Sequence, residues 1–405
     1  MAVDAAVIKT HLKALAKAAV PLALGVSLPL MAAILPEERF DALYHSYEGD
    51  QVKISGPSVQ IRENVGEHVS MTYHYYVDNI TSASVDVRTY GSPYKEQRVE
   101  NSLGMDFLAD NSTISAGFTN SEENDYTSNT SFFSVSHDMF GQLTTVGLAF
   151  SLGRDQVRQG KDPIKVGNYN RNTDSDVKGE VTRHSYSLDI SQILTKNMVL
   201  GLGYETISDT GYLHNPYRNV VLDDGDQNTP PTVAESYPGV HTSSALALRA
   251  MYYLPYRAKL YGETRLFRDS WGVVGQMYQA GYTHPFGRNV TFDIYYRTYS
   301  QTKATFYQDI FTQKLVYMAR DKELATYTSD AVSATLNVNV LKNPWWIFDK
   351  GSANVSYTRL NLNYQDFLDR TGTASDLTRF TTSCDHCPPL ALDASIVQFY
   401  LSLWY

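Results

Sequence analysis

Long runs of alternating apolar and polar residues constrain the fold of this chain more than any other feature. In residues 331–341, every second position from Val332 to Val340 is apolar, and small or polar residues lie between them. Successive side chains of a β-strand point to opposite faces, so this pattern predicts a strand with one apolar and one polar face. Residues 142–154 and 393–405 repeat the pattern.

About 16 segments of this kind follow one another, most of them about 9–14 residues long. That length crosses a bilayer at a tilt, whereas strands of soluble proteins average about 5–6 residues. The predicted strands are residues 39–47, 51–62, 68–77, 95–108, 112–120, 127–137, 142–154, 181–194, 197–208, 243–254, 258–268, 275–283, 289–299, 331–341, 352–364 and 393–405. A count of 14 is the alternative, in which the first two segments form a periplasmic or plugging segment.

The links between these strands alternate in length. Long links are residues 155–180, 209–242, 300–330 and 367–392, and the tight turns between them are residues 139–141, 195–196, 255–257 and 285–288. Outer-membrane barrels have short periplasmic turns on one side and long extracellular loops on the other. The sequence therefore predicts an all-β fold, a transmembrane antiparallel up-and-down β-barrel of about 16 strands in the outer membrane of a Gram-negative bacterium.

The N-terminal segment has the order of a secretory signal. Lys9, Lys13 and Lys17 precede an apolar stretch that ends in small residues. We therefore predict a signal peptide over residues 1–33 and an outer-membrane β-barrel over residues 34–405. The alternative for the first segment is a short amphipathic or membrane-anchoring helix.

The net charge excludes one class of partner. The full chain carries −9, and removal of the three lysines and Asp4 with the signal leaves −11. Binding to nucleic acid requires a surplus of Lys and Arg against the phosphates, so we expect no nucleic-acid partner.

The last strand ends on an aromatic residue, Tyr405, in an amphipathic segment. Together with the export signal and the alternating links, this ending predicts the signal that the barrel assembly machinery reads. Trp271, Trp345, Trp346 and Trp404 are expected to lie with Tyr405 in the aromatic belts at the two membrane interfaces.

Several segments resemble an uncharacterised bacterial outer-membrane β-barrel family, domain of unknown function 3570. They are YYVDNITSASVDV with SPYKEQR, TNSEENDY, QILTKNMVLGLGYE, NPYR, YYLPYRA, SWG, GYTHP and ARDKEL, in this order between residues 75 and 324. The resemblance implies an outer-membrane barrel of about this length whose function is not established. It also implies an association with periplasmic redox components or small lipoproteins as partners.

Charged residues at strand positions are the first candidates for function. A charge on the lipid face costs about 2–4 kcal/mol near the midplane, so we expect these side chains to face the lumen. The lumen-lining candidates are Arg98, Glu100, Asp106, Arg249, Glu263, Arg265, Asp293 and Arg297. They form either a selectivity lining or a paired network of arginines and carboxylates that simply fills a narrow barrel.

Three chemical groups lie close together in the last long loop. Cys384 and Cys387 could close a small disulfide, or they could bind a metal ion with His386, and exposed thiols are the third possibility. The histidine lies between the two cysteines, so the segment does not match the haem attachment pattern. Apart from this possible metal, no cofactor is expected.

Two charged clusters are predicted in loops, SPYKE at residues 92–96 and ARDKEL at residues 319–324. Such clusters are either solvated or part of a plug or a partner contact.

The leading functional hypothesis is a conduit, porin-like or gated, or a scaffold for an envelope transport or electron-transfer system. The alternatives are a structural or adhesive barrel and, less favoured, a barrel hydrolase. His184 with Ser185 and His137 with Asp138 point to opposite faces of their strands, so no catalytic triad is evident and we expect no enzyme.

Overall fold

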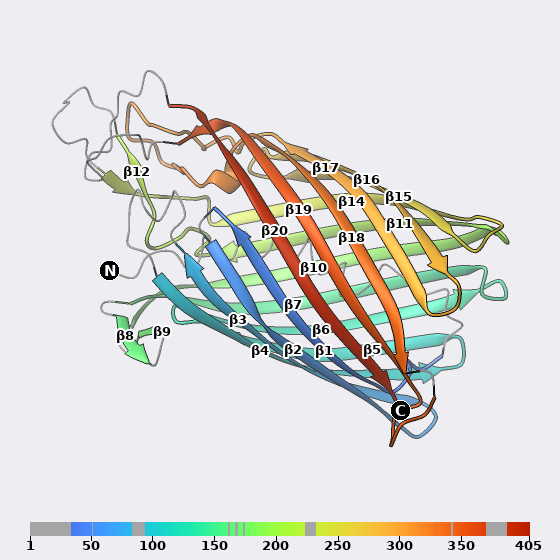
Figure 1. Cartoon of the computed structure of the whole chain (residues 1–405). Coiled ribbons are helices and arrows are strands. Elements are labelled where there is room, and N and C mark those ends of the chain that lie inside the picture. Colours follow the sequence, from blue (N-terminus) through green and yellow to red (C-terminus); the bar gives the residue numbers. More distant parts are fainter. Residues whose placement is uncertain are drawn as a thin grey trace.

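Sixteen strands close into one barrel in the computed structural model (Figure 1). The structure describes residues 34–50, 52–82, 94–160, 163–166, 169–172, 175–222, 232–341, 343–369 and 387–405. Each barrel strand pairs antiparallel with the next, and β20 closes the barrel against β1. The prediction of an up-and-down barrel with 16 strands is confirmed. The alternative of 14 strands is wrong, because β1 and β2 belong to the wall.

The strands of the barrel wall are β1 (Arg39–Gly49), β2 (Val52–Val65), β3 (Val69–Ser82), β4 (Tyr94–Ala109), β5 (Ser112–Glu122), β6 (Tyr126–Met139), β7 (Thr144–Gly160), β10 (Ser175–Thr195), β11 (Met198–Gly211), β14 (Val240–Tyr253), β15 (Lys259–Asp269), β16 (Val274–Phe286), β17 (Val290–Gln301), β18 (Tyr327–Leu341), β19 (Lys350–Leu368) and β20 (Pro389–Trp404). Two small hairpins lie outside the wall, β8 (Pro163–Val166) with β9 (Tyr169–Asn172) and β12 (Asn219–Val221) with β13 (Thr232–Ala234). The 3-10 turn η1 (Lys322–Leu324) lies between β17 and β18.

The described part of the chain contains no helix that is both long and apolar enough to cross a membrane.

Several strands are longer than the sequence pattern predicts. β7 continues to Gly160 and β10 begins at Ser175, so the predicted link over residues 155–180 is much shorter in the structure. Lys95 and Glu96, placed from the sequence both in the strand over residues 95–108 and in a charged loop cluster, belong to β4. These extensions are mostly polar, with Val157 and Val177 as exceptions, so they lack the alternation by which strands are recognised.

The two faces of the wall differ as the alternation predicts. Residues directly opposite each other in an antiparallel pair lie on the same face of the sheet. On one face, large apolar side chains such as Leu103, Leu148, Leu266, Tyr278 and Phe399 are exposed. This is the outward face, because a membrane barrel presents an apolar band to lipid. The opposite face, which carries most of the charged pairs, lines the lumen.

The two ends of the barrel differ in their connections. Short turns such as Lys196–Asn197, between β10 and β11, join the strands at the end where the C-terminus lies (Figure 1). Gly66 and Gly287 have φ angles of 70° and 66° in two of these turns, a conformation that glycine adopts without strain. The hairpins β8–β9 and β12–β13 and the long connections lie at the opposite end, which we assign as extracellular.

Candidate functional site

The extracellular mouth is partly covered by residues 302–326, the segment between β17 and β18, which we call the mouth loop. Ala304, Phe306 and Tyr307 of this loop are buried in one apolar cluster with Tyr364 of β19 and Leu390 of β20. The strand register places Tyr364 and Leu390 on the inward face of the wall. The mouth loop therefore lies against the inner wall of β18–β20.

Backbone hydrogen bonds hold the mouth loop to two neighbouring connections. The Thr305 amide donates to the Trp271 carbonyl over 2.8 Å, and Ser236 and Met318 exchange two bonds of 3.0 and 2.9 Å. Trp271 is 8% exposed and its Nε1 donates to the Val240 carbonyl. The prediction that Trp271 belongs to a membrane-interface belt is therefore wrong, because it packs under the mouth loop.

The charged ARDKEL segment of the mouth loop is buried. Lys322 is 1% exposed, and its Nζ lies 3.1 Å from Asp50 in the turn between β1 and β2. The Arg320 guanidinium lies 2.8 Å from Asp309 and stacks 4.4 Å from the Phe367 ring centre. The solvated interpretation of this segment is thus wrong, and its charges instead tie the mouth loop to other parts of the mouth.

Four residues connect the mouth loop to residues 212–239, the connection between β11 and β14, and we call them the latch: Arg218, Glu235, Arg320 and Asp321. Asp321 pairs with Arg218 over 2.9 Å. Glu235 accepts from the Arg320 amide over 2.7 Å and, through its other oxygen, from the Tyr237 hydroxyl over 2.7 Å. All four latch residues are at least nine-tenths buried.

Burial has an electrostatic consequence for the latch. Loss of solvation raises the pKa of Glu235 to about 7, with Arg218 opposing this shift and Asp321 adding to it. Burial also raises the pKa of Tyr237 well above its usual value, so Tyr237 stays a donor to Glu235. The charge of the latch therefore changes near neutral pH.

Charged side chains inside the barrel lie along the wall. Arg249 on β14 reaches across β11 to Asp189 on β10 over 3.2 Å, and it also contacts Glu263 on β15 over 3.3 Å. A Cβ at Gly203 of β11 would come within 2.8 Å of Asp189, so glycine provides the space for this bridge. Arg265 crosses β14 in the same way to reach Glu205 over 2.6 Å.

An aromatic side chain also lies across a glycine of the inner face. Tyr261 on β15 lies over Gly281 of β16 and donates to Asp293 on β17 over 2.8 Å. A Cβ at Gly281 would come within 2.2 Å of the Tyr261 ring. Glycines on the inner face thus let long side chains lie flat along the wall.

A family model described as "Protein of unknown function (DUF3570)" matches residues 12–342. The chain belongs to this family. The resemblance found in the sequence is thereby confirmed, and the barrel described above is the structure of a DUF3570 protein. A search of curated proteins found no match to the sequence.

Solved structures resemble the DUF3570 barrel at low identity. A bacterial polysaccharide outer membrane secretin is 7% identical, with a TM-score of 0.47 over 92% of this chain and 99% of that chain. CdiB from Acinetobacter baumannii is 9% identical, with a TM-score of 0.45 over 92% of this chain and 60% of that chain. The siderophore receptor PirA from Pseudomonas aeruginosa is 11% identical, with a TM-score of 0.40 over 91% of this chain and 63% of that chain. This chain spans less than two thirds of the latter two proteins.

All eight lumen-lining candidates lie at inward positions of the DUF3570 barrel. They are Arg98, Glu100 and Asp106 on β4, Arg249 on β14, Glu263 and Arg265 on β15, and Asp293 and Arg297 on β17. The structure brings Arg249 and Glu263 into contact, whereas Arg265 and Asp293 have partners that were not among the candidates. Their role in selecting solutes stays a prediction.

Sequence reasoning missed several members of the inner wall. Asp189 and Glu205 lie at inward positions of β10 and β11, and the period-two pattern could have identified them. Asp78 is fully buried on β3, where it contacts His45 over 2.7 Å and Arg98 over 3.3 Å. Nothing in the sequence links these three residues, because they come from three different strands.

Two groups bear on metal binding. Glu96, Glu123 and Asp125 bring carboxylate oxygens within 4.8 Å of one another at the extracellular end, and oxygen ligands of this kind suit divalent cations. Cys384 and His386 lie outside the described residues. Cys387 is described and has no free thiol. The choice between a disulfide and a metal site in that loop stays a prediction.

Tyr405 lies at the seam where the barrel closes. Its hydroxyl donates to the Arg62 carbonyl and to Glu63, both over 3.0 Å. Its role as an assembly signal stays a prediction.

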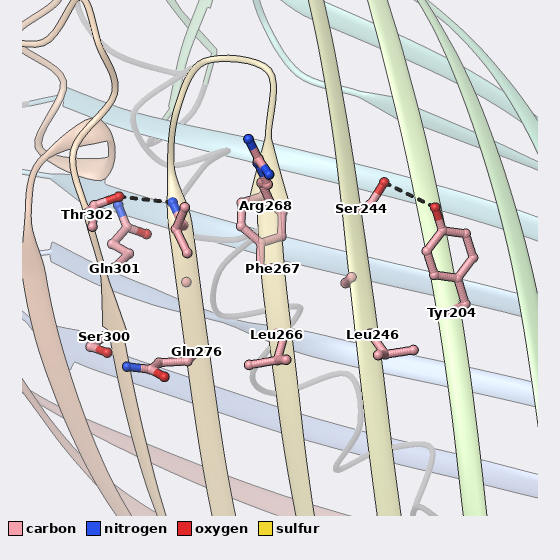
Figure 2. Close-up of a pocket in the computed structure, with 13 residues that line it drawn as sticks. Tyr204, Ser244, Leu246, Leu266, Phe267, Arg268, Gln276, Ser300, Gln301 and Thr302 are labelled. Atoms are coloured by element: carbon pink, nitrogen blue, oxygen red, sulfur yellow. Dashed lines mark hydrogen bonds between the residues drawn. The ribbon is translucent and has the colours of Figure 1, made fainter.

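A groove of about 600 Å³ lies on the outward face of β11 and β14–β17 (Figure 2). Tyr204, Leu246 and Leu266 lie beside it at matching positions of β11, β14 and β15, with Arg268 nearer the extracellular end. Because these side chains point outward, the groove faces lipid and belongs to neither the lumen nor the mouth.

Proposed function

We propose that this DUF3570 protein is a conduit through the outer membrane whose extracellular entrance is narrowed by the mouth loop. One observation carries the proposal. Among the described residues, side-chain contacts between barrel strands join neighbouring strands or strands one apart, such as Arg249 with Asp189, and none crosses the lumen. A barrel with 16 strands is wide enough to leave an aqueous channel when its side chains do not fill it.

The exposure of inner charges on β10, β11 and β15 supports a wet lumen beside these strands. The side chains of Asp189, Glu205 and Arg265 are 55%, 34% and 32% exposed although they face inward. Charges that filled a narrow barrel would be buried against one another. The selectivity lining is therefore the favoured interpretation of these residues, and the proposal assigns them no catalytic step and no cofactor.

The covered entrance gives the proposal its second part. The mouth loop packs on one side of the inner wall and is tied down by the latch and by the contact between Lys322 and Asp50. Solutes entering from outside would pass this loop. A periplasmic redox or lipoprotein partner would have its access from the opposite end, where the turns are short.

Single-channel conductance of the refolded protein in a planar bilayer tests the proposal. A gel shift on heating first shows that the barrel is folded. We expect stable conductance steps, with larger steps when the mouth loop is released by Arg218→Met. A folded barrel without steps in either form would overturn the conduit and favour the scaffold or adhesive alternative.

A further inference from the structure

The charged side chains of the inner wall are unevenly distributed around the barrel. On β1–β7, inward carboxylates outnumber inward basic side chains. The carboxylates are Asp41, Asp78, Glu96, Glu100, Asp106, Asp138 and Asp155, and the basic side chains are Arg39, Arg62 and Arg98. We call this part the acidic wall.

Hydroxyl groups hold several carboxylates of the acidic wall. Asp106 accepts from Ser115 over 2.5 Å, and Asp138 accepts from Thr145 over 2.6 Å. Asp155 accepts from Ser128 over 2.6 Å. Hydrogen bonds from neutral donors stabilise the ionised form of a carboxylate without cancelling its charge. Arginines of the acidic wall pair with Asp41, Asp78 and Glu100, and its described carboxylates still outnumber them.

The rest of the inner wall does not balance this charge. On β10–β17 acidic and basic side chains are closer in number. The carboxylates are Asp176, Asp189, Glu205, Asp209, Glu263, Asp269 and Asp293, and the basic side chains are Arg183, Arg249, Lys259, Arg265 and Arg297.

The third part of the wall is neutral. On β18–β20, the inward positions between the two rims carry side chains such as Ser333, Asn337, Ser356 and Gln398. Lys350 adds a charge at the periplasmic edge, where it pairs with Glu37 over 2.7 Å. The mouth loop packs on the extracellular end of this neutral part and also reaches Asp50 between β1 and β2.

From this distribution we infer that the lumen selects cationic solutes. The inference rests on the proposed conduit and names the class of solute that it carries. Fixed charges of one sign, surrounded by a low-dielectric wall, concentrate ions of the opposite sign, and rings of Asp and Glu favour cations in channels. Glu100 and Asp106 are half-buried at inward positions of β4, so they are the residues of the acidic wall that passing ions meet.

The reversal potential in a tenfold gradient of KCl tests this inference. We expect potassium to permeate more readily than chloride. The double variant Glu100→Gln with Asp106→Asn should lower the permeability ratio at least about twofold, because two inward charges are lost. The amide oxygen introduced by Asp106→Asn can still accept from Ser115, so the local hydrogen bond is kept.

Asp393→Asn is the matched control. Asp393 lies on the outward face of β20 and its side chain is 58% exposed, so this change alters net charge without altering the lumen. The ratio should stay unchanged in this variant. A double variant that behaves like the control would overturn the role of the acidic wall.

The failures of the two proposals are distinguishable. Steps with chloride preference, or with no preference, would overturn the cation selectivity and leave the conduit standing. A folded barrel without any steps would overturn the conduit, and the inference with it.

Discussion

At the scale of single residues, burial decides which ionisable side chains change their charge near neutral pH. Glu235 illustrates this, since a carboxyl with an ordinary pKa of 4.5 has a raised value of about 7 in the latch. The cause is burial, and its partners Tyr237 and the Arg320 amide do not compensate fully. A group with a raised pKa favours the folded arrangement most when it is protonated.

We expect the mouth loop to be held less firmly as the pH rises. The contribution of Glu235 to docking is fully present below about pH 4.5 and is lost as the pH rises through about 7. Amide hydrogen exchange at Ser236 and Met318, corrected for its intrinsic pH dependence, should be slower at about pH 5 than at about pH 8. Glu235→Gln should remove this difference. Equal protection from exchange at both pH values in the unaltered protein would contradict this role of Glu235.

The inner-face glycines support a second prediction at this scale. Gly281→Ala should displace the Tyr261 ring from Asp293 and destabilise the barrel by roughly 1–3 kcal/mol, a typical cost of overpacking. Gly147→Ala is the control, because the nearest atoms to its added Cβ lie 3.9 Å away. Urea unfolding in lipid vesicles measures the stability of both variants. Similar midpoints for the two variants would show that the ring can move aside at little cost.

At the scale of elements, the mouth loop differs from the strands in what stabilises it. The strands have ladders of backbone hydrogen bonds, whereas the mouth loop depends on an apolar cluster and on buried charge pairs. Removing one partner of a buried pair is costly because the other charge stays buried, and about 3–5 kcal/mol is typical. A single substitution in the latch can therefore release the loop while the barrel stays intact.

The variant Arg218→Met tests whether the latch holds the mouth loop. We expect the mouth loop to become sensitive to a non-specific protease while the gel shift of the barrel on heating is unchanged. Lys303→Met is the control, since Lys303 also lies in the mouth loop but is half-exposed and 3.9 Å from Asp366. Equal cleavage of both variants would mean that the latch does not hold the loop.

At the scale of the whole molecule, the division of the inner wall into acidic, paired and neutral parts follows from the order of the strands. Neighbours in sequence are neighbours in the barrel, so the acid-rich N-terminal strands form one continuous side. The mouth loop packs on the neutral C-terminal strands. The proposed ion selectivity and the covered entrance thus involve different parts of one closed sheet, and the reversal potential tests the first without disturbing the second.

The sequence by itself determined the fold class, a count of about 16 strands with 14 as the alternative, and the face on which each candidate lies. These properties depend on a period of two residues and on the lengths of links, both of which are local. Residues such as Arg249 and Asp293 could be assigned to the inner face for this reason.

Only the tertiary structure decided which side chains meet. Asp189 reaches Arg249 across an intervening strand, and Lys322 meets Asp50 although 272 positions separate them. Such contacts depend on the register of many strand pairs and on closure of the barrel, which no local pattern contains. The burial of the ARDKEL segment has the same cause, because a charged loop is solvated unless another loop and the inner wall supply its partners.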